Sequence, residues 1–426
     1  MTMKKYLFIL LALSNYSYVS AQFVPNYDES KVPEFSLPEV LITNSGKKVT
    51  TVEEWEQVRR PEILSLFENE VYGKIPETEV DVSYKVIESK QDVLEGLANR
   101  KQIRITFTKK DKNVSADLLI YLPAKEKHPV PLFLGLNFNG NHTILPDKAI
   151  YMTDSWMRNN SSVNIFDNRS NELSRGCNTS RWPVLYLLSR GYGLAVIYYG
   201  DIDPDFDDGF QNGIQPLFYK MGQSTPEPDE WGSIGAWAYG LSKALDYFEK
   251  DKDIDASKVA VIGHSRLGKT SLWAGAMDER FALVISNESG CGGAALSKRR
   301  FGETVGRINS SFPHWFCDNF NKYNNNEDAL TVDQHMLIAL MAPRPVYIAS
   351  AIGDQWSDPK GEFLSGVYAE PVYTLFGLDG LQDNTMPDVN KPYLDGHIGY
   401  HIRSGDHDLT YYDWLQFINF ADKYLK

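Results

Sequence analysis

Five short, almost uninterrupted apolar runs, separated by helical patterns, constrain the fold of this 426-residue chain more than any other feature. The runs span residues 131–137, 193–199, 259–263, 283–287 and 346–351. Strands without polar alternation are buried on both faces, as in a parallel sheet covered by helices. The helical patterns that supply this cover span residues 234–250, 267–277, 328–341 and 411–424. The sequence therefore predicts an α/β fold, with a mostly parallel central sheet flanked by helices in a three-layer sandwich.

The region before the first buried run has a different character. Two β-type runs, 102–108 and 116–123, are separated by a polar turn and predict an antiparallel hairpin. Residues 52–71 follow a helical period that Pro61 is expected to interrupt. Residues 22–50 are rich in proline and polar residues and should run irregularly over the surface. Since no repeat or long linker divides the chain, we expect a single domain over 22–426 with this N-terminal extension.

The first 21 residues have the layout of a cleavable signal peptide. Two lysines at positions 4 and 5 precede an apolar run at 6–13, and Val-Ser-Ala at 19–21 resembles a cleavage site. The apolar run is too short to span a bilayer. No Cys lies at the expected cleavage point, so nothing indicates a lipid anchor. We therefore expect an exported protein, periplasmic or secreted, that is not held in a membrane.

Charge and cysteine content exclude several classes of partner. The formal net charge of −13 would repel nucleic acid and anionic membranes, so neither is an expected partner. No spacing of Cys or His resembles a metal site. In an oxidising compartment, the three cysteines allow one disulfide, for which Cys291 with Cys317 is the first choice. We expect a monomer that needs neither metal nor organic cofactor.

The most informative segment is 258–270 (KVAVIGHSRLGKT), which runs from an apolar strand through a tight turn into a helix. That context is a nucleophile elbow, in which the turn lifts a serine hydroxyl clear of the sheet. Gly263 and Gly268 provide room around Ser265, although the second glycine comes one residue later than usual because Leu267 precedes it. A chance Gly-x-Ser at a strand end is the competing interpretation. We expect Ser265 to be the nucleophile of an α/β-hydrolase fold.

A serine nucleophile needs a general base, which an acid must orient. In this fold the chain order is serine, acid, histidine. His407 is the predicted base because it lies between the strand-like segment 396–402 and the last helical pattern. Glu288 and Asp354 each follow a strand, and either could be the acid. The competing interpretation of each carboxylate is a turn or helix cap.

Basic residues around the elbow are further candidates. Arg266 and Lys269 follow Ser265 in the first turn of its helix, where cations oppose the helix dipole. This placement favours a role in the site over a solvated position. Arg266 could stabilise an oxyanion through its backbone N–H and its guanidinium. His314, in a Phe-Pro-His-Trp-Phe loop, is a candidate for lining the site, whereas His264 is expected to pack beside the elbow.

Several motifs, taken together, carry a family resemblance. They are Gly-x-Ser-Arg-x-Gly-Lys at 263–269, Ser-Asn-Glu-Ser-Gly at 286–290, Gly-Glu-Thr at 302–304, Gly-Asp-Gln-Trp-x-Asp-Pro at 353–359 and Gly-Asp-His at 405–407. From about Val130 to the C-terminus, the chain resembles the glucuronoyl esterases, carbohydrate esterase family fifteen. Fungal members carry a disulfide-forming Cys where this chain has His264. The insertions within 151–229 resemble those of bacterial members.

The resemblance implies hydrolysis of the ester between a (4-O-methyl-)glucuronic acid carboxyl on xylan and an alcohol of lignin. It implies that Ser265 attacks the carbonyl and that His407, oriented by Glu288 or Asp354, relays the proton. Arg266 would stabilise the oxyanion. The positions implied to hold the sugar hydroxyls and the ring face are those of Lys269, Glu303 and Trp356.

Two other functions compete with this one. An acetyl xylan or cinnamoyl (feruloyl) esterase would use the same triad, but it would not need the charged residues Arg266, Lys269 and Glu303. A non-catalytic glycan-binding protein on a hydrolase fold is a third reading. The intact Ser265 and His407 oppose it.

Overall fold

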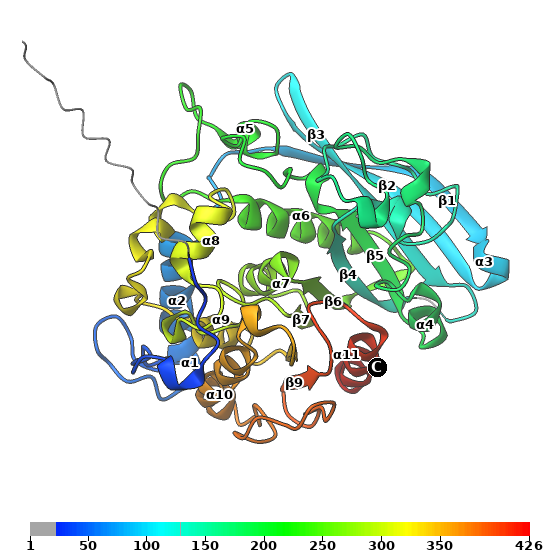
Figure 1. Cartoon of the computed structure of the whole chain (residues 1–426). Helices are drawn as coiled ribbons and strands as arrows, with labels where there is room; N and C mark the ends of the chain where they lie inside the picture. Colours follow the sequence, from blue (N-terminus) through cyan, green and yellow to red (C-terminus); the bar gives the residue numbers. More distant parts are fainter. Residues whose placement is uncertain (1–22, 128) are drawn as a thin grey trace, which may run out of the picture.

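The computed structural model describes residues 23–127 and 129–426 (Figure 1). The predicted signal peptide lies outside the described residues. Within them, nine strands form one sheet in the order β1-β2-β3-β5-β4-β6-β7-β8-β9. The strands are β1 (Asp81–Asp92), β2 (Ala98–Lys109), β3 (Lys112–Pro123), β4 (Val130–Asn137), β5 (Gly193–Tyr198), β6 (Ile254–His264), β7 (Leu283–Asn287), β8 (Val346–Ala351) and β9 (Ile398–Arg403).

The sheet has an antiparallel edge and a parallel body. β2 and β3 pair antiparallel over their whole lengths, which confirms the predicted hairpin and lengthens both of its strands. β1 extends this edge antiparallel, and β5 joins β3 in the same sense. All strand pairs from β5 through β4 to β9 are parallel. The five apolar runs therefore form strands β4 to β8, and the predicted mostly parallel sheet is confirmed.

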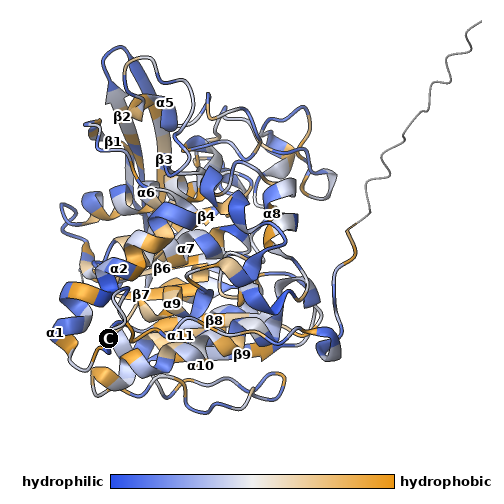
Figure 2. Cartoon of the chain, turned by 90° about the vertical axis from the view of Figure 1, so that its left-hand side faces the viewer, coloured by the Kyte–Doolittle hydropathy of each residue, from blue (hydrophilic) through white to orange (hydrophobic). Residues whose placement is uncertain are grey.

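Helices cover both faces of this sheet. Each buried strand sends alternate residues to the two layers, so that Val259 and Val261 of β6 point to one layer and Ala260 and Ile262 to the other. Hydrophobic residues, orange in Figure 2, gather on the central strands and on the helices packed against them. The first layer contains α6 (Ser233–Phe248), α7 (Arg266–Met277), α9 (Gln334–Ala339) and α10 (Pro359–Leu375), and the second contains α4 (Val184–Ser189) and α11 (Tyr411–Tyr424). The three-layer sandwich is confirmed.

Two helical predictions were wrong in detail. The helix expected over 328–341 is regular only in α9, because the Asp333 carboxylate caps it by accepting the Gln334 N–H at 2.8 Å. Pro61 does not interrupt residues 52–71. It lies in the first turn of α2 (Arg60–Phe67), where its missing N–H is tolerated, and a π-helical turn at Trp55–Arg59 precedes it.

The expected disulfide was also wrong. Cys291 and Cys317 are both free thiols, as is Cys177. The Cys317 sulfur lies 3.9 Å from the Asn69 carbonyl oxygen, and burial raises the pKa of this thiol to about 12. Cys291 and Cys317 therefore act as small buried residues of the core.

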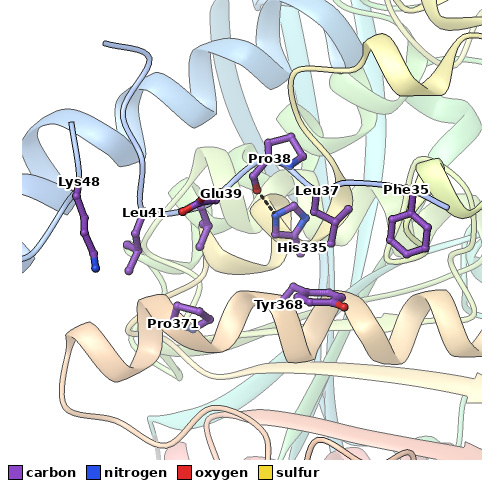
Figure 3. A pocket seen from close by; sticks show the side chains of 10 residues that line it. Phe35, Leu37, Pro38, Glu39, Leu41, Lys48, His335, Tyr368 and Pro371 are labelled. Atoms are coloured by element: carbon purple, nitrogen blue, oxygen red, sulfur yellow. Dashed lines mark hydrogen bonds between the residues drawn. The ribbon is translucent and has the colours of Figure 1, made fainter. Parts of the chain in front are cut away.

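The N-terminal extension is irregular, as predicted, apart from a short 3₁₀ turn at Glu29–Lys31 and an isolated β-bridge between Ile42 and Lys48. Its residues 35–48 lie against α9 and α10 and border an apolar cavity of about 460 Å³ (Figure 3). There, His335 of α9 lies 2.9 Å from the Pro38 carbonyl oxygen, to which its Nε2 is the donor. This part of the extension is thus fixed to α9.

Candidate active site

Ser265 occupies a strained turn between β6 and α7. Its backbone has φ 58° and ψ −128°, a conformation that non-glycine residues rarely adopt. The Ser265 N–H donates to the Asn287 carbonyl at 2.8 Å, which anchors the turn to β7. A side chain at Gly263 would place its Cβ 1.8 Å from the Leu267 carbonyl oxygen, so only glycine fits there. The geometry is that of a nucleophile elbow.

His407 lies in the loop between β9 and α11 with two carboxylates beside it. Its Nδ1 is 2.6 Å from Asp354 Oδ2 and 3.2 Å from Glu288 Oε2. Asp354 follows β8 and Glu288 follows β7, so the carboxyl ends of two parallel strands bring both acids to one imidazole. His407 and Ser265 line the same cavities.

The two carboxylates differ in their other partners. Asp354 accepts a hydrogen bond from the imidazole Nδ1, at 2.6 Å. Glu288 accepts from the Arg403 guanidinium at 2.6 Å and from the Asp408 N–H at 3.0 Å. Glu288 therefore ties the loop that carries His407 to β9, in addition to facing the ring.

The contacts among His407, Asp354 and Glu288 shift the pKa values of all three groups. Burial lowers the pKa of His407, but the hydrogen bonds and charges of Asp354 and Glu288 outweigh burial and raise the pKa to about 9. Burial raises the pKa of Glu288 to about 7, against the opposing effects of His407 and Arg403. Burial also acts to raise the pKa of Asp354, yet the bond from His407 dominates and the pKa is lowered. Asp354 is thus the carboxylate that stays ionised most readily.

The Arg266 side chain is held by a buried carboxylate that the sequence analysis missed. Asp205 pairs with the Arg266 guanidinium and also accepts from the Tyr199 hydroxyl at 2.8 Å and the Trp315 indole N–H at 2.8 Å. The guanidinium carbon lies 4.8 Å from the centre of the Trp315 ring. These contacts fix the cation beside Ser265, where negative charge would develop on a substrate oxygen.

His314 occupies a different position from the one expected. Its Nε2 lies 3.0 Å from Asp205 Oδ1, and the side chain is buried. His314 is not among the lining residues of either cavity next to Ser265. It supports Asp205, and through it Arg266, because its Nε2 N–H donates to that carboxylate.

One cavity beside Ser265, of about 330 Å³, contains the predicted sugar-binding residues. We call it the Lys269 cavity; Lys269, Glu303 and Trp356 line it with Ser265 and His407. The Lys269 ammonium donates to the Ser289 carbonyl. Burial lowers the pKa of Lys269 and raises the pKa of Glu303, and each partly offsets the shift of the other. The cavity thus offers a buried cation, a buried acid and an indole face.

A second cavity of about 250 Å³ also borders Ser265, and we call it the Arg158 cavity. Ser265, Arg266 and His407 line both cavities, so Ser265 lies where the two meet. The remaining lining residues of the second cavity are Phe138, Asn139, Arg158, Asn159, Asn160, Arg181, Tyr199 and His264.

His264 packs beside the elbow. Asn287 lies 2.8 Å from its Nδ1, its ring centre is 4.5 Å from that of His407, and burial lowers its pKa well below the usual value. Donor atoms of His264, Glu288 and His407 lie within 4.8 Å of one another, a spacing that could hold a metal ion. Because Glu288 is bound by Arg403 and His264 by Asn287, the described contacts account for this cluster without one.

Taken together, the site offers a hydroxyl on a strained turn, an imidazole paired with carboxylates and a fixed cation. These groups suit acyl transfer from an ester.

The chain matches the family model of the fungal glucuronyl esterases over residues 187–377. It is 55% identical over 400 residues to carbohydrate esterase MZ0003 from an unknown prokaryotic organism, covering 94% of this chain and 92% of that protein. The chain belongs to carbohydrate esterase family 15, the glucuronoyl esterases.

Solved structures of this family share the fold of the chain. The glucuronoyl esterase from Solibacter usitatus is 50% identical with a TM-score of 0.88, covering 93% of this chain and all of that one (100%). The family 15 glucuronoyl esterase from Teredinibacter turnerae is 31% identical with a TM-score of 0.80, covering 95% and 93% of the two chains. The α/β-hydrolase fold of this family 15 esterase is therefore established over nearly its whole described length.

The N-terminal extension reaches the active site of this esterase, which the sequence analysis did not predict. The Phe23 ring packs edge-on against Trp356 with 6.1 Å between centroids. Asn26 accepts the Gly302 N–H at 2.8 Å, and the Glu303 N–H donates to the Trp356 carbonyl at 3.0 Å. Residues 23–26 thus support the wall of the Lys269 cavity.

Proposed function

We propose that the protein hydrolyses esters between the carboxyl group of (4-O-methyl-)glucuronic acid on glucuronoxylan and alcohols of lignin. The observation that carries the proposal is the Lys269 cavity, where Lys269, Glu303 and Trp356 adjoin Ser265. A uronate presents hydroxyls for the charged groups and an apolar C–H face for the indole. Fungal relatives, such as the one from Phanerochaete chrysosporium at 32% identity over 211 residues, are named 4-O-methyl-glucuronoyl methylesterases.

The reaction follows the acyl-enzyme mechanism of serine esterases. The Ser265 hydroxyl attacks the uronoyl carbonyl carbon while His407 takes its proton. The Arg266 guanidinium stabilises the oxyanion of the tetrahedral intermediate. His407 then gives the proton to the departing alcohol, and a water activated by His407 releases the uronic acid from Ser265.

Asp354 is the acid that we assign to orient His407. Its 2.6 Å bond to Nδ1 selects the tautomer in which Nε2 is free to accept the serine proton. Glu288 supports the loop of His407 through Arg403 and Asp408 and adds a second negative charge near the ring. Both carboxylates stabilise the imidazolium that forms during the reaction.

We expect the protein to act as an exported monomer, outside the cytoplasm, where plant polysaccharides are found. The signal-like layout of residues 1–21 supports export. Among residues 23–127 and 129–426, no helix has the length and hydrophobicity needed to cross a membrane.

The test compares three esters with the mature protein and its Ser265→Ala variant: benzyl glucuronate, an aryl acetate and methyl ferulate. We expect kcat/KM to be highest for the glucuronate, and the variant to lose about 10⁴-fold or more in kcat. A preference for acetate or ferulate would replace the glucuronoyl assignment by an acetyl xylan or feruloyl esterase. No Ser265-dependent turnover of any ester would favour a glycan-binding protein.

A further inference from the structure

The Arg158 cavity differs in charge from the Lys269 cavity. Its lining contains Arg158, Arg181 and Arg266 but no carboxylate. The lining of the Lys269 cavity includes three acids, which are Glu288, Glu303 and Asp354. The whole chain carries a formal net charge of −13. The Arg158 cavity, lined by arginines without an acid, is therefore a positively charged region in a negatively charged protein.

The carboxylates behind this cavity do not balance its cations. Asp205 is already bound to Arg266, and its Oδ2 is 3.9 Å from Arg158 Nη2. Arg158 donates to the Asp205 backbone carbonyl at 3.3 Å, and its side chain is 56% exposed. Arg181 pairs with Asp408 at 2.7 Å, with its side chain 34% exposed. Three guanidinium groups thus share two carboxylates, and two of the three remain accessible to a ligand.

The position of the cavity determines which part of a substrate can reach it. The acyl carbon must lie at Ser265, where the two cavities meet. With the uronate in the Lys269 cavity, as in the proposed function, the ester oxygen and its alcohol point to the opposite side. His407 borders that side too, as it must in order to protonate the departing alcohol.

We propose that the Arg158 cavity binds the alcohol portion of the ester and selects alcohols that carry a carboxylate. Arg158 and Arg181 are the specificity-determining residues, because a guanidinium binds a carboxylate through two parallel hydrogen bonds. The amide N–H groups of Asn139, Asn159 and Asn160 offer donors to hydroxyls on the same alcohol, since their Oδ1 atoms already accept hydrogen bonds within the protein. This inference rests on the proposed function.

The test uses three glucuronate esters that differ only in the para group of a benzyl alcohol: hydrogen, carboxylate or aminomethyl. We expect the wild-type kcat/KM for the 4-carboxybenzyl ester to exceed that for the benzyl ester by about two- to fivefold, the range of exposed ion pairs. The aminomethyl ester should be the poorest of the three. The preference should shrink in high salt, because ions screen exposed charges.

Substitutions of the two arginines test whether they bind the carboxylate of the alcohol portion. Arg158→Gln and Arg181→Gln should each reduce the carboxylate-to-neutral ratio of kcat/KM, and together they should bring it to about one. Arg169→Gln is the matched control, since it removes an exposed arginine from the same insertion without lining the cavity. It should keep the wild-type ratio.

The outcomes separate this inference from the function on which it rests. Hydrolysis of all three glucuronates at equal kcat/KM, or a preference that survives in the double variant, overturns the carboxylate-binding role and leaves the glucuronoyl assignment intact. Failure to hydrolyse any glucuronate, with turnover of an aryl acetate, overturns both. A variant that loses the ratio while still hydrolysing the neutral ester supports the proposal, because its site is still folded.

Discussion

At the scale of single residues, the site depends on His407 and the two carboxylates that face it. A general base works when it is neutral, so a raised pKa moves activity to higher pH. With the His407 pKa raised to about 9, we expect kcat/KM on benzyl glucuronate to fall as the pH decreases below that value. The ring is 41% exposed, and therefore bound substrate can change this pKa by removing water.

Substitution of the acids tests their roles. Asp354→Asn removes the closer charge and the bond to Nδ1, so kcat should fall by about 10²- to 10⁴-fold and the acidic limb of the pH profile should move to lower pH. Glu288→Gln should shift the profile less, because Glu288 lies farther from Nδ1 and is bound to Arg403. A larger loss of kcat in Glu288→Gln than in Asp354→Asn would make Glu288 the orienting acid.

Sequence could identify residues of the site on two grounds: some positions are dictated by the fold, whereas the sugar-binding roles of Lys269, Glu303 and Trp356 were implied by the family resemblance alone. Ser265, Glu288 and Asp354 each follow a buried parallel strand, so the pattern of apolar runs led to them. The pattern of apolar runs could not show whether Glu288 or Asp354 orients His407, because both acids follow a buried strand. Asp205 lies in an insertion without periodicity. The one available signal was Arg266, since a cation fixed beside a nucleophile needs a carboxylate partner.

At the scale of elements, the N-terminal extension acts as a support for the active site. Beyond the contact of Phe23 with Trp356, Glu29 binds Arg299 at 2.5 Å and Lys360 at 2.8 Å. Arg299 also pairs with Asp358 at 2.8 Å, two residues after Trp356. The extension thus connects the loop before Glu303 to the start of α10.

Phe23→Ala should loosen Trp356 and weaken sugar binding. We expect KM for benzyl glucuronate to rise by about three- to tenfold with kcat almost unchanged, because the variant leaves Ser265 and His407 in place. Phe35→Ala is the matched control, since Phe35 lies in the same extension but lines the cavity of Figure 3. A similar rise in KM in both variants, or a loss confined to kcat, would show that Phe23 does not position Trp356.

Elements were predictable where burial was complete. Strands β4 to β8 appear in the sequence as continuous apolar runs, and α6 and α11 as long periodic segments. β1 was missed because it is an edge strand whose residues are exposed or half-buried along its length. The expected helix over 328–341 failed because Asp333, a buried cap, looks in sequence like any polar residue on a helix.

At the scale of the whole molecule, the sheet brings five distant segments to one edge. Ser265 and Glu288 directly follow β6 and β7, and Asp354 lies in the turn after β8. The segments after β5 and β9 add Asp205 and His407. Two cavities of different charge meet at this edge: acids line the Lys269 cavity together with Lys269 and Arg266, and arginines without an acid line the Arg158 cavity. We assign the acyl half of the ester to the Lys269 cavity and the alcohol half to the Arg158 cavity.

The crystal structure of Ser265→Ala with benzyl glucuronate tests this assignment most directly. We predict that the ester carbonyl lies beside residue 265 and Arg266, with the uronate ring against Lys269, Glu303 and Trp356. The benzyl group should lie in the Arg158 cavity, on the other side of His407. A uronate ring bound among Arg158 and Arg181, with the benzyl group against Trp356, would contradict the account.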